Sequence, residues 1–148
     1  DKTVYPVSSR NSQDFINLMR VYLDAVFNPL AVKQPYTFYQ EGWHYELYDE
    51  KDIPSIKGVV YNEMQGSFAN AENYCGELLM QQLFPDNGYG YCSGGDPEVI
   101  PTLTYEKFCA QHKKHYHPTN SLIYLDGKMD IEKVLGIIND EYLSKEGI

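Results

Sequence analysis

The chain has 148 residues, of which 43% are hydrophobic and 14% aromatic, enough for one hydrophobic core and too many for a disordered segment. Its 21 acidic residues outnumber its 12 basic ones, and the formal net charge of −9 disfavours nucleic acid as a partner. No uninterrupted apolar run approaches the roughly 20 residues that span a bilayer, so we expect no membrane partner.

The beginning of the chain predicts a strand followed by a helix. Residues 1–6 enter an apparent strand without any leader, so we expect the natural protein to extend further N-terminally. Capping side chains at residues 9–12 precede apolar residues that recur at helical spacing from Phe15 to Phe27, and Asn28-Pro29 ends the pattern. The spacing of these apolar residues predicts an amphipathic helix.

The middle of the chain predicts helices around a strand and a long loop. Residues 36–42 are typical of a short helix, and 43–48 alternate as a strand before a polar turn at 49–54. Two helices then follow, at 57–69 and 72–84, and we expect them to form an angled pair. Residues 86–101 are rich in glycine and proline, which predicts a long ordered loop.

The last third predicts a capped helix at 104–116, a strand at Ser121–Leu125 and a final helix from Asp130 to about Leu143. Helices and strands therefore intermix along the whole chain. The expected fold class is α+β, an α/β sandwich-like arrangement with a mostly antiparallel sheet of three or four strands packed against helices.

The three cysteines, Cys75, Cys92 and Cys109, lack the close C-x-x-C spacing of zinc or redox pairs. Their odd number predicts three free thiols in a reducing compartment.

Glu63 is an unusually placed carboxylate in the predicted helix 57–69. At about 100° per residue it projects between Val59 and Val60, inside the arc that Met64 and Phe68 continue. A charge there should be solvated or paired, and a metal ion is one possible partner. Residue chemistry alone leaves both interpretations open.

Four histidines offer two further metal or acid–base candidates. His112 and His115 can share a helix face, but His117 lies beside the helix end, so a polar helix C-terminus competes with a metal site. His44 and Glu46 lie on one face of the predicted strand. They could form an acid–base pair, serve as two metal ligands or be a solvated polar pair, and two residues do not decide between these interpretations.

Several segments, in order along nearly the whole chain, resemble the presequence-protease branch of the pitrilysin/insulinase zinc metallopeptidases. The most telling are Lys57-Gly58-Val59-Val60-Tyr61-Asn62-Glu63-Met64, Ser93-Gly94-Gly95-Asp96-Pro97 and Tyr116-His117-Pro118-Thr119-Asn120. Others are Thr3-Val4-Tyr5-Pro6-Val7, residues 21–27, Gln40-Glu41-Gly42-Trp43, residues 83–87 and residues 100–104.

In that family an H-x-x-E-H motif supplies two zinc-binding histidines and a general-base glutamate, and a Glu on a later helix is the third protein ligand. The resemblance assigns that ligand to Glu63. The chain contains no H-x-x-E-H, so the general base is expected upstream of Asp1 and no catalytic residue is assigned here. We therefore expect Zn²⁺ in the parent protein but no stoichiometric binding by this chain, and no activity from it alone.

The resemblance further implies that residues 1–148 are a single partial domain, the C-terminal part of an N-terminal catalytic α/β domain. The parent would be an endopeptidase that degrades short unstructured peptides, in the cytoplasm if bacterial or an organelle matrix if eukaryotic. Its expected partners are peptide substrates and the remaining domains of the parent, and the isolated chain is expected to be prone to self-association. The alternative is a non-catalytic, chamber-forming member of the same fold family.

Overall fold

The computed structural model describes residues 2–144, and its backbone divides into two compact units. The first unit combines residues 1–33 with 109–148, and the second comprises residues 34–108. Each unit is described by itself below.

The first unit begins with helix α1 (Ser12–Phe27), as the apolar spacing predicts. The side chain of Asn11 caps it by accepting hydrogen bonds from the backbone N–H groups of Gln13 and Asp14, both within 3.1 Å. A short helix that the sequence did not reveal, α2 (Leu30–Lys33), follows directly after Pro29.

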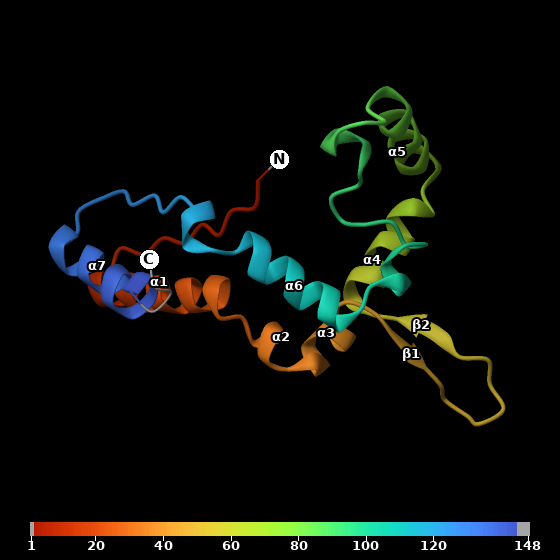
Figure 1. The fold of residues 1–148 in the computed structure, drawn as a ribbon, viewed down its shortest axis with the longest axis horizontal. Helices are drawn as coiled ribbons and strands as arrows, with labels where there is room; N and C mark the ends of the chain where they lie inside the picture. The colour runs from red at the N-terminus through yellow and green to blue at the C-terminus, as the bar shows by residue number, and fades with distance from the viewer. Residues whose placement is uncertain (1, 145–148) are drawn as a thin grey trace. The chain divides into compact units, whose positions relative to one another are not determined.

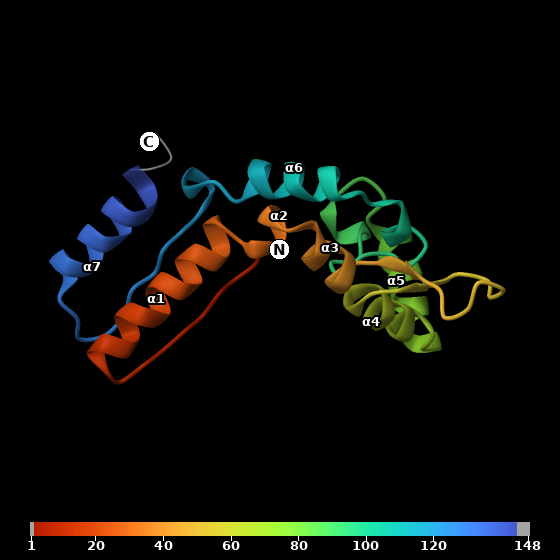
Figure 2. The ribbon, with the colours of Figure 1, turned by 90° about the horizontal axis from the view of Figure 1, so that it is seen from below.

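Helix α1 packs against α7 (Ile131–Ile138), which continues as a π-helical turn, η4 (Asn139–Leu143), so the predicted final helix is confirmed. Figure 2 shows the two helices side by side. Met19, Val134 and Ile138 are buried between them and form the α1–α7 core.

An ion pair reinforces this packing. Arg20 donates from Nε to Glu141 Oε2 at 2.9 Å and from a terminal nitrogen to Oε1 at 2.5 Å. The hydroxyl of Tyr142 donates to the carbonyl of Arg20 at 2.9 Å. These bonds join the middle of α1 to η4.

Length and composition alone would allow residues Ser12–Lys33 to cross a membrane. The stretch is interrupted by charges, and Arg20 within it is paired with Glu141. Met19 on the same helix is buried against α7. These contacts are those of an amphipathic helix packed on another helix. Such a helix can have the same length and apolar composition as a membrane-spanning one.

Helix α6 (Tyr105–His115) confirms the predicted helix 104–116, and the hydroxyl of Thr104 caps it by accepting from the N–H of Lys107 at 3.3 Å. A turn of 3₁₀ helix, η3 (Pro118–Asn120), follows it. The hydroxyls of Tyr5 and Tyr116 hydrogen-bond at 3.0 Å, which ties the N-terminal segment to the end of α6.

The predicted strand at Ser121–Leu125 is wrong for the described structure, and so is the apparent strand at residues 1–6, of which the structure describes residues 2–6. Both segments are drawn as threads rather than arrows in Figure 1. A strand needs a neighbour for its backbone hydrogen bonds, and neither segment has one among the described residues. The apolar and aromatic residues typical of a strand are present in both segments, but a pairing partner is not found among residues 2–144.

The second unit opens with α3 (Pro35–Glu41), as predicted. The predicted strand 43–48 is confirmed over a shorter length as β1 (His44–Glu46), which pairs antiparallel with β2 (Ser55–Lys57). In this hairpin Tyr45 is opposite Ile56. Strand β2 was not predicted, because its three residues lie between a polar turn and a helix start.

Helices α4 (Val59–Phe68) and α5 (Ala71–Leu83) follow, and Figure 1 shows them meeting at an angle, as expected. Asn73 on α5 donates from its side chain to the carbonyl of Ser67 at 3.3 Å. Two 3₁₀ turns, η1 (Gly88–Gly90) and η2 (Ile100–Thr102), lie in the glycine-rich loop.

Helices accompanied by an antiparallel pair of strands confirm the α+β class. The sheet of the described residues has two strands instead of the three or four expected. Each missing strand would need a pairing partner that residues 2–144 do not provide.

Candidate functional site

The start of α4, the helix that carries Glu63, is fixed by a close backbone contact. Gly58 precedes the helix with φ of 149°, and a Cβ at this residue would lie 2.1 Å from the carbonyl oxygen of Gly42. The N–H of Tyr61 donates to the same carbonyl at 3.3 Å. Only glycine permits this approach, so the chain direction at the start of α4 depends on Gly58.

The glycine-rich loop supports the middle of α4. Met64 is the buried residue of this helix, with 8% exposure. A Cβ on Gly94 would lie 2.3 Å from the Met64 sulfur, so the loop backbone rests directly on that side chain. Asp96 orders the loop because its carboxylate accepts from the N–H of Glu98 at 2.8 Å. The loop therefore acts as a packing surface for α4.

Glu63 itself is exposed and has no hydrogen bond or ion pair with another described residue. Val59 and Val60, one turn earlier, are 54% and 39% exposed. Val59 and Val60, the apolar side chains on either side of Glu63 in the predicted arc, are therefore open to solvent, although Met64 in the same arc is buried. Water can reach the carboxylate of Glu63, so it needs no protein partner there.

The residues present do not by themselves fit a zinc ion. Structural and catalytic zinc sites use three or four protein ligands. Among residues 2–144, no three side chains of His, Cys, Asp or Glu gather closely enough to hold a metal. Glu63 offers one unengaged carboxylate on a fixed helix, and the remaining ligands would have to come from elsewhere.

His44 and Glu46 both line an open pocket of about 340 Å³ beside the start of α4, together with Lys57 and Asn62. The ring Nδ1 of His44 lies 2.8 Å from the carbonyl oxygen of Tyr39. Since a carbonyl can only accept, Nδ1 carries the proton in this contact and Nε2 is the free acceptor of the neutral ring.

Glu46 is engaged by the hydroxyl of Tyr48, and this hydrogen bond to the carboxylate raises the Tyr48 pKa. His44 is opposite Lys57 and Glu46 opposite Ser55 across the hairpin. These contacts describe a cross-strand polar surface, one of the alternatives that the sequence left open.

The histidines near the end of α6 have separate partners. His112 Nε2 lies 2.9 Å from the carbonyl oxygen of Val26, and its ring stacks on Tyr116 at 4.6 Å between centroids. His117 Nδ1 accepts from the N–H of Thr119 at 3.3 Å. The ring nitrogens of His112 and His117 in these contacts are thus engaged by other groups of the protein, distant in sequence for His112 and adjacent for His117.

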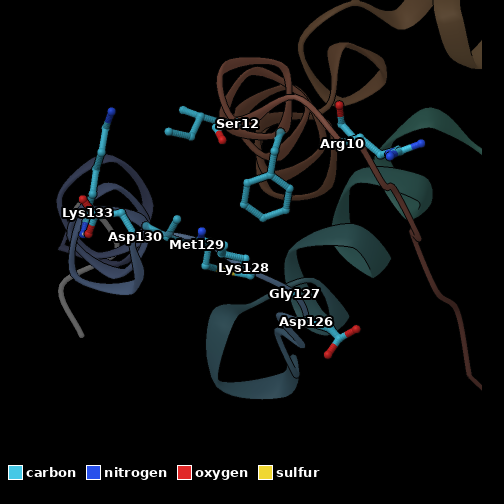
Figure 3. Close-up of a pocket in the computed structure, with 12 residues that line it drawn as sticks. Arg10, Ser12, Asp126, Gly127, Lys128, Met129, Asp130 and Lys133 are labelled. Carbon is cyan, nitrogen blue, oxygen red and sulfur yellow. The ribbon is translucent and has the colours of Figure 1, made fainter.

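A cavity of about 260 Å³ lies in the first unit, between the segments that lead into α1 and α7 (Figure 3). Its lining mixes cations and anions, including Arg10, Asp126 and Lys133. The N-termini of both helices are already capped by Asn11 and Asp130. This cavity does not assemble an acid–base or metal site.

Comparison with known proteins identifies relatives of the whole chain. No family model matches the chain. The chain is 50% identical over 143 residues to presequence protease 1, chloroplastic/mitochondrial, of Arabidopsis thaliana, a match that covers 97% of this chain and 13% of that protein. It is 44% identical over 149 residues to the mitochondrial presequence protease of Drosophila melanogaster, covering 99% of this chain and 14% of that protein. The chain is homologous to a segment of the presequence proteases.

A bacterial relative shows the same pattern. Protein HypA of Clostridium perfringens (strain 13 / Type A) is 52% identical over 143 residues, which is 97% of this chain and 15% of that protein. The chain thus spans 13% to 15% of the length of these relatives.

The three cysteines of the chain are free thiols in the structure, as expected. Burial, together with a hydrogen bond to Glu77, raises the pKa of Cys92, whereas Cys75 is exposed.

We expect iodoacetamide at pH 8 to modify Cys92 several-fold more slowly than Cys75, because a raised pKa leaves less reactive thiolate. The rate at Cys92 should increase as pH rises toward its pKa. Peptide mass spectrometry at timed intervals measures both rates. In guanidinium the two rates should converge, and faster native modification of Cys92 than of Cys75 would contradict the prediction.

Proposed function

We propose that this chain is part of a longer zinc-dependent endopeptidase that degrades short unstructured peptides. The observation that carries the proposal is the 44% to 50% identity to proteins named presequence proteases over 97% to 99% of the chain. In this proposal residues 1–148 are the C-terminal part of the first catalytic domain.

Glu63 is the proposed zinc ligand within this chain. Its support is the Asn62-Glu63-Met64 resemblance together with an exposed carboxylate that lacks a partner among the described residues. Gly58 and Gly94 hold α4 at its start and middle, so the helix can present the carboxylate in a fixed direction. A bound zinc would polarise the scissile carbonyl and acidify a water molecule.

Two histidines and a general-base glutamate from an H-x-x-E-H motif outside these 148 residues would complete the site. This chain alone is therefore proposed to be inactive. The proposed partners are peptide substrates and the rest of the longer protein. The names of the plant and fly relatives place those proteins in mitochondria or chloroplasts, and we propose an organelle matrix for a eukaryotic parent and the cytoplasm for a bacterial one.

Cleavage of an unstructured peptide of about 20 residues tests the proposal. The full-length protein should cleave it, a chelator should abolish cleavage, and added zinc should restore it. The 148-residue chain should leave the same peptide intact. A full-length protein that is folded and zinc-supplemented yet inactive would overturn the proposal and favour the non-catalytic, chamber-forming alternative.

A further inference from the structure

Asn87 is followed by Gly88 in the turn that leaves α5, and this is the one Asn-Gly pair in the 148-residue sequence. Both residues are exposed. Asn87 is the N-cap of η1, and its side-chain Oδ1 accepts a hydrogen bond from the N–H of Tyr89 at 3.0 Å. Figure 1 shows the chain turning back beside α5 after this helix ends. The pair therefore lies in an open, capped turn rather than inside a helix.

The surroundings of Gly88 suit attack of its backbone nitrogen on the side chain of Asn87. The N–H of Gly88 makes no hydrogen bond to another described residue. A Cβ placed on Gly88 would meet nothing within 4 Å, so the space around it is open. The hydrogen bond from Tyr89 withdraws electron density from the side-chain carbonyl of Asn87, which makes Cγ more electrophilic. The nucleophile is thus free, the carbonyl is polarised, and glycine adds no side chain that would hinder their approach.

We propose that Asn87 is a site of spontaneous deamidation. The nitrogen of Gly88 bonds to Cγ of Asn87 to form a cyclic imide, the Cγ–Nδ2 bond breaks, and ammonia leaves with the proton from Gly88. Water then opens one of the two C–N bonds of the imide, which gives aspartate or isoaspartate. The net reaction is hydrolysis of the side-chain amide, so it needs neither an oxidant nor an enzyme. The proposal does not rest on peptidase activity of the longer protein.

Ring closure requires a local opening of the turn. Asn87 has an extended ψ of 177°, and its backbone carbonyl accepts from the N–H of Gly90 at 3.2 Å. Turning ψ toward the ring breaks this bond and the bond from Tyr89 to the side chain. Both bonds belong to one short 3₁₀ turn, so its opening costs far less free energy than the unfolding of α5. The reaction therefore proceeds in the folded protein.

Isoaspartate changes the loop that supports α4, because it adds one methylene group to the backbone between residues 87 and 88. The turn that follows has little room for it. Gly90 is buried, and a Cβ there would lie 2.2 Å from the carbonyl oxygen of Phe84. The rings of Phe84 and Tyr89 are 5.5 Å apart between centroids. Deamidation to isoaspartate should therefore loosen η1 from the end of α5.

Timed peptide mass spectrometry of the folded full-length protein, kept at mildly alkaline pH, tests the proposal. The peptide that contains Asn87 should gain about 1 Da, at a rate at least about 10-fold higher than the peptide that contains Asn70. Asn70 is the matched internal control. It is exposed and caps α5 by accepting from the N–H of Glu72 at 3.0 Å, but Ala71 follows it. Equal rates at the two asparagines, or no modification of Asn87 in the folded protein, would overturn the proposal.

Two substitutions in the full-length protein separate the chemistry from its structural effect. Alanine fits at residue 88, because Gly88 has no positive φ and its surroundings are open. Gly88→Ala should slow deamidation about 10-fold or more, and an unchanged rate would contradict the proposal.

Asn87→Asp supplies one of the two products and keeps a capping side chain. Amide hydrogen exchange at residues 89–91 should become faster as the unchanged protein ages, but it should stay slow in fresh Asn87→Asp protein. Equally fast exchange in fresh Asn87→Asp protein would contradict the assignment of the loosening to isoaspartate.

Discussion

Replacing Glu63 with Gln in the full-length protein is expected to lower kcat/KM for a short peptide by about 100-fold or more. The amide keeps the size of the side chain but removes the negative charge that a zinc ligand contributes. Because Glu63 is exposed and makes no hydrogen bond or ion pair with another described residue, the substitution should leave the folded state intact. Steady-state cleavage assays with equal concentrations of folded enzyme measure the effect.

Metal content distinguishes a lost ligand from a lost substrate contact. The Glu63→Gln protein should hold less zinc than the unchanged protein by elemental analysis after dialysis. Glu72→Gln is the matched control, since Glu72 is an exposed carboxylate on the adjacent helix α5. The 148-residue chain should bind no stoichiometric zinc. Tight zinc binding by that chain, abolished by Glu63→Gln, would contradict the proposed ligand set.

Gly58→Val should destabilise the second unit by about 2 kcal/mol or more. The new Cβ would lie 2.1 Å from the carbonyl oxygen of Gly42 and 2.7 Å from the Cα of Trp43. Both are backbone atoms, so no side-chain rotation can relieve the clash. A φ of 149° adds strain for any residue with a side chain. The midpoint of urea unfolding, followed by Trp43 fluorescence, measures the loss.

Gly66→Ala is the control for this substitution. Gly66 lies on the same helix, and a Cβ there meets nothing within 4 Å. Since alanine favours a helix more than glycine does, this change should raise stability by about 0.5 to 1 kcal/mol. Equal effects of the two substitutions would show that the contact between Gly58 and Gly42 does not fix the start of α4.

The helices could be predicted because their signals are local. Asn28-Pro29 ends α1, Thr104 caps α6 and Asp130 caps α7, all within a few residues of the helix they delimit. The start of α4 was predicted two residues early, at Lys57 instead of Val59. Lys57 belongs to β2 instead, and the reason is the long-range contact between Gly58 and Gly42.

The strands were predicted less accurately than the helices, because a strand is stable only when its backbone pairs with a neighbouring strand. Ser121–Leu125 has the apolar and aromatic composition of a strand but pairs with no other strand among residues 2–144. Ser55–Lys57 has little strand signal, yet it pairs with β1 through a short hairpin. The histidines show the same limit, since the partner of His112 is the carbonyl of Val26, far away in sequence.

The sequence by itself determined the α+β class, most helix limits and the presequence-protease resemblance that singles out Glu63. These depend on short-range capping, side-chain spacing and ordered motifs, all of which are written in neighbouring residues. Only the tertiary structure decided that Glu63 is exposed, that Gly58 and Gly94 hold its helix, and that Ser121–Leu125 is unpaired. Each of these depends on backbone atoms from distant segments meeting or failing to meet, which no local pattern encodes.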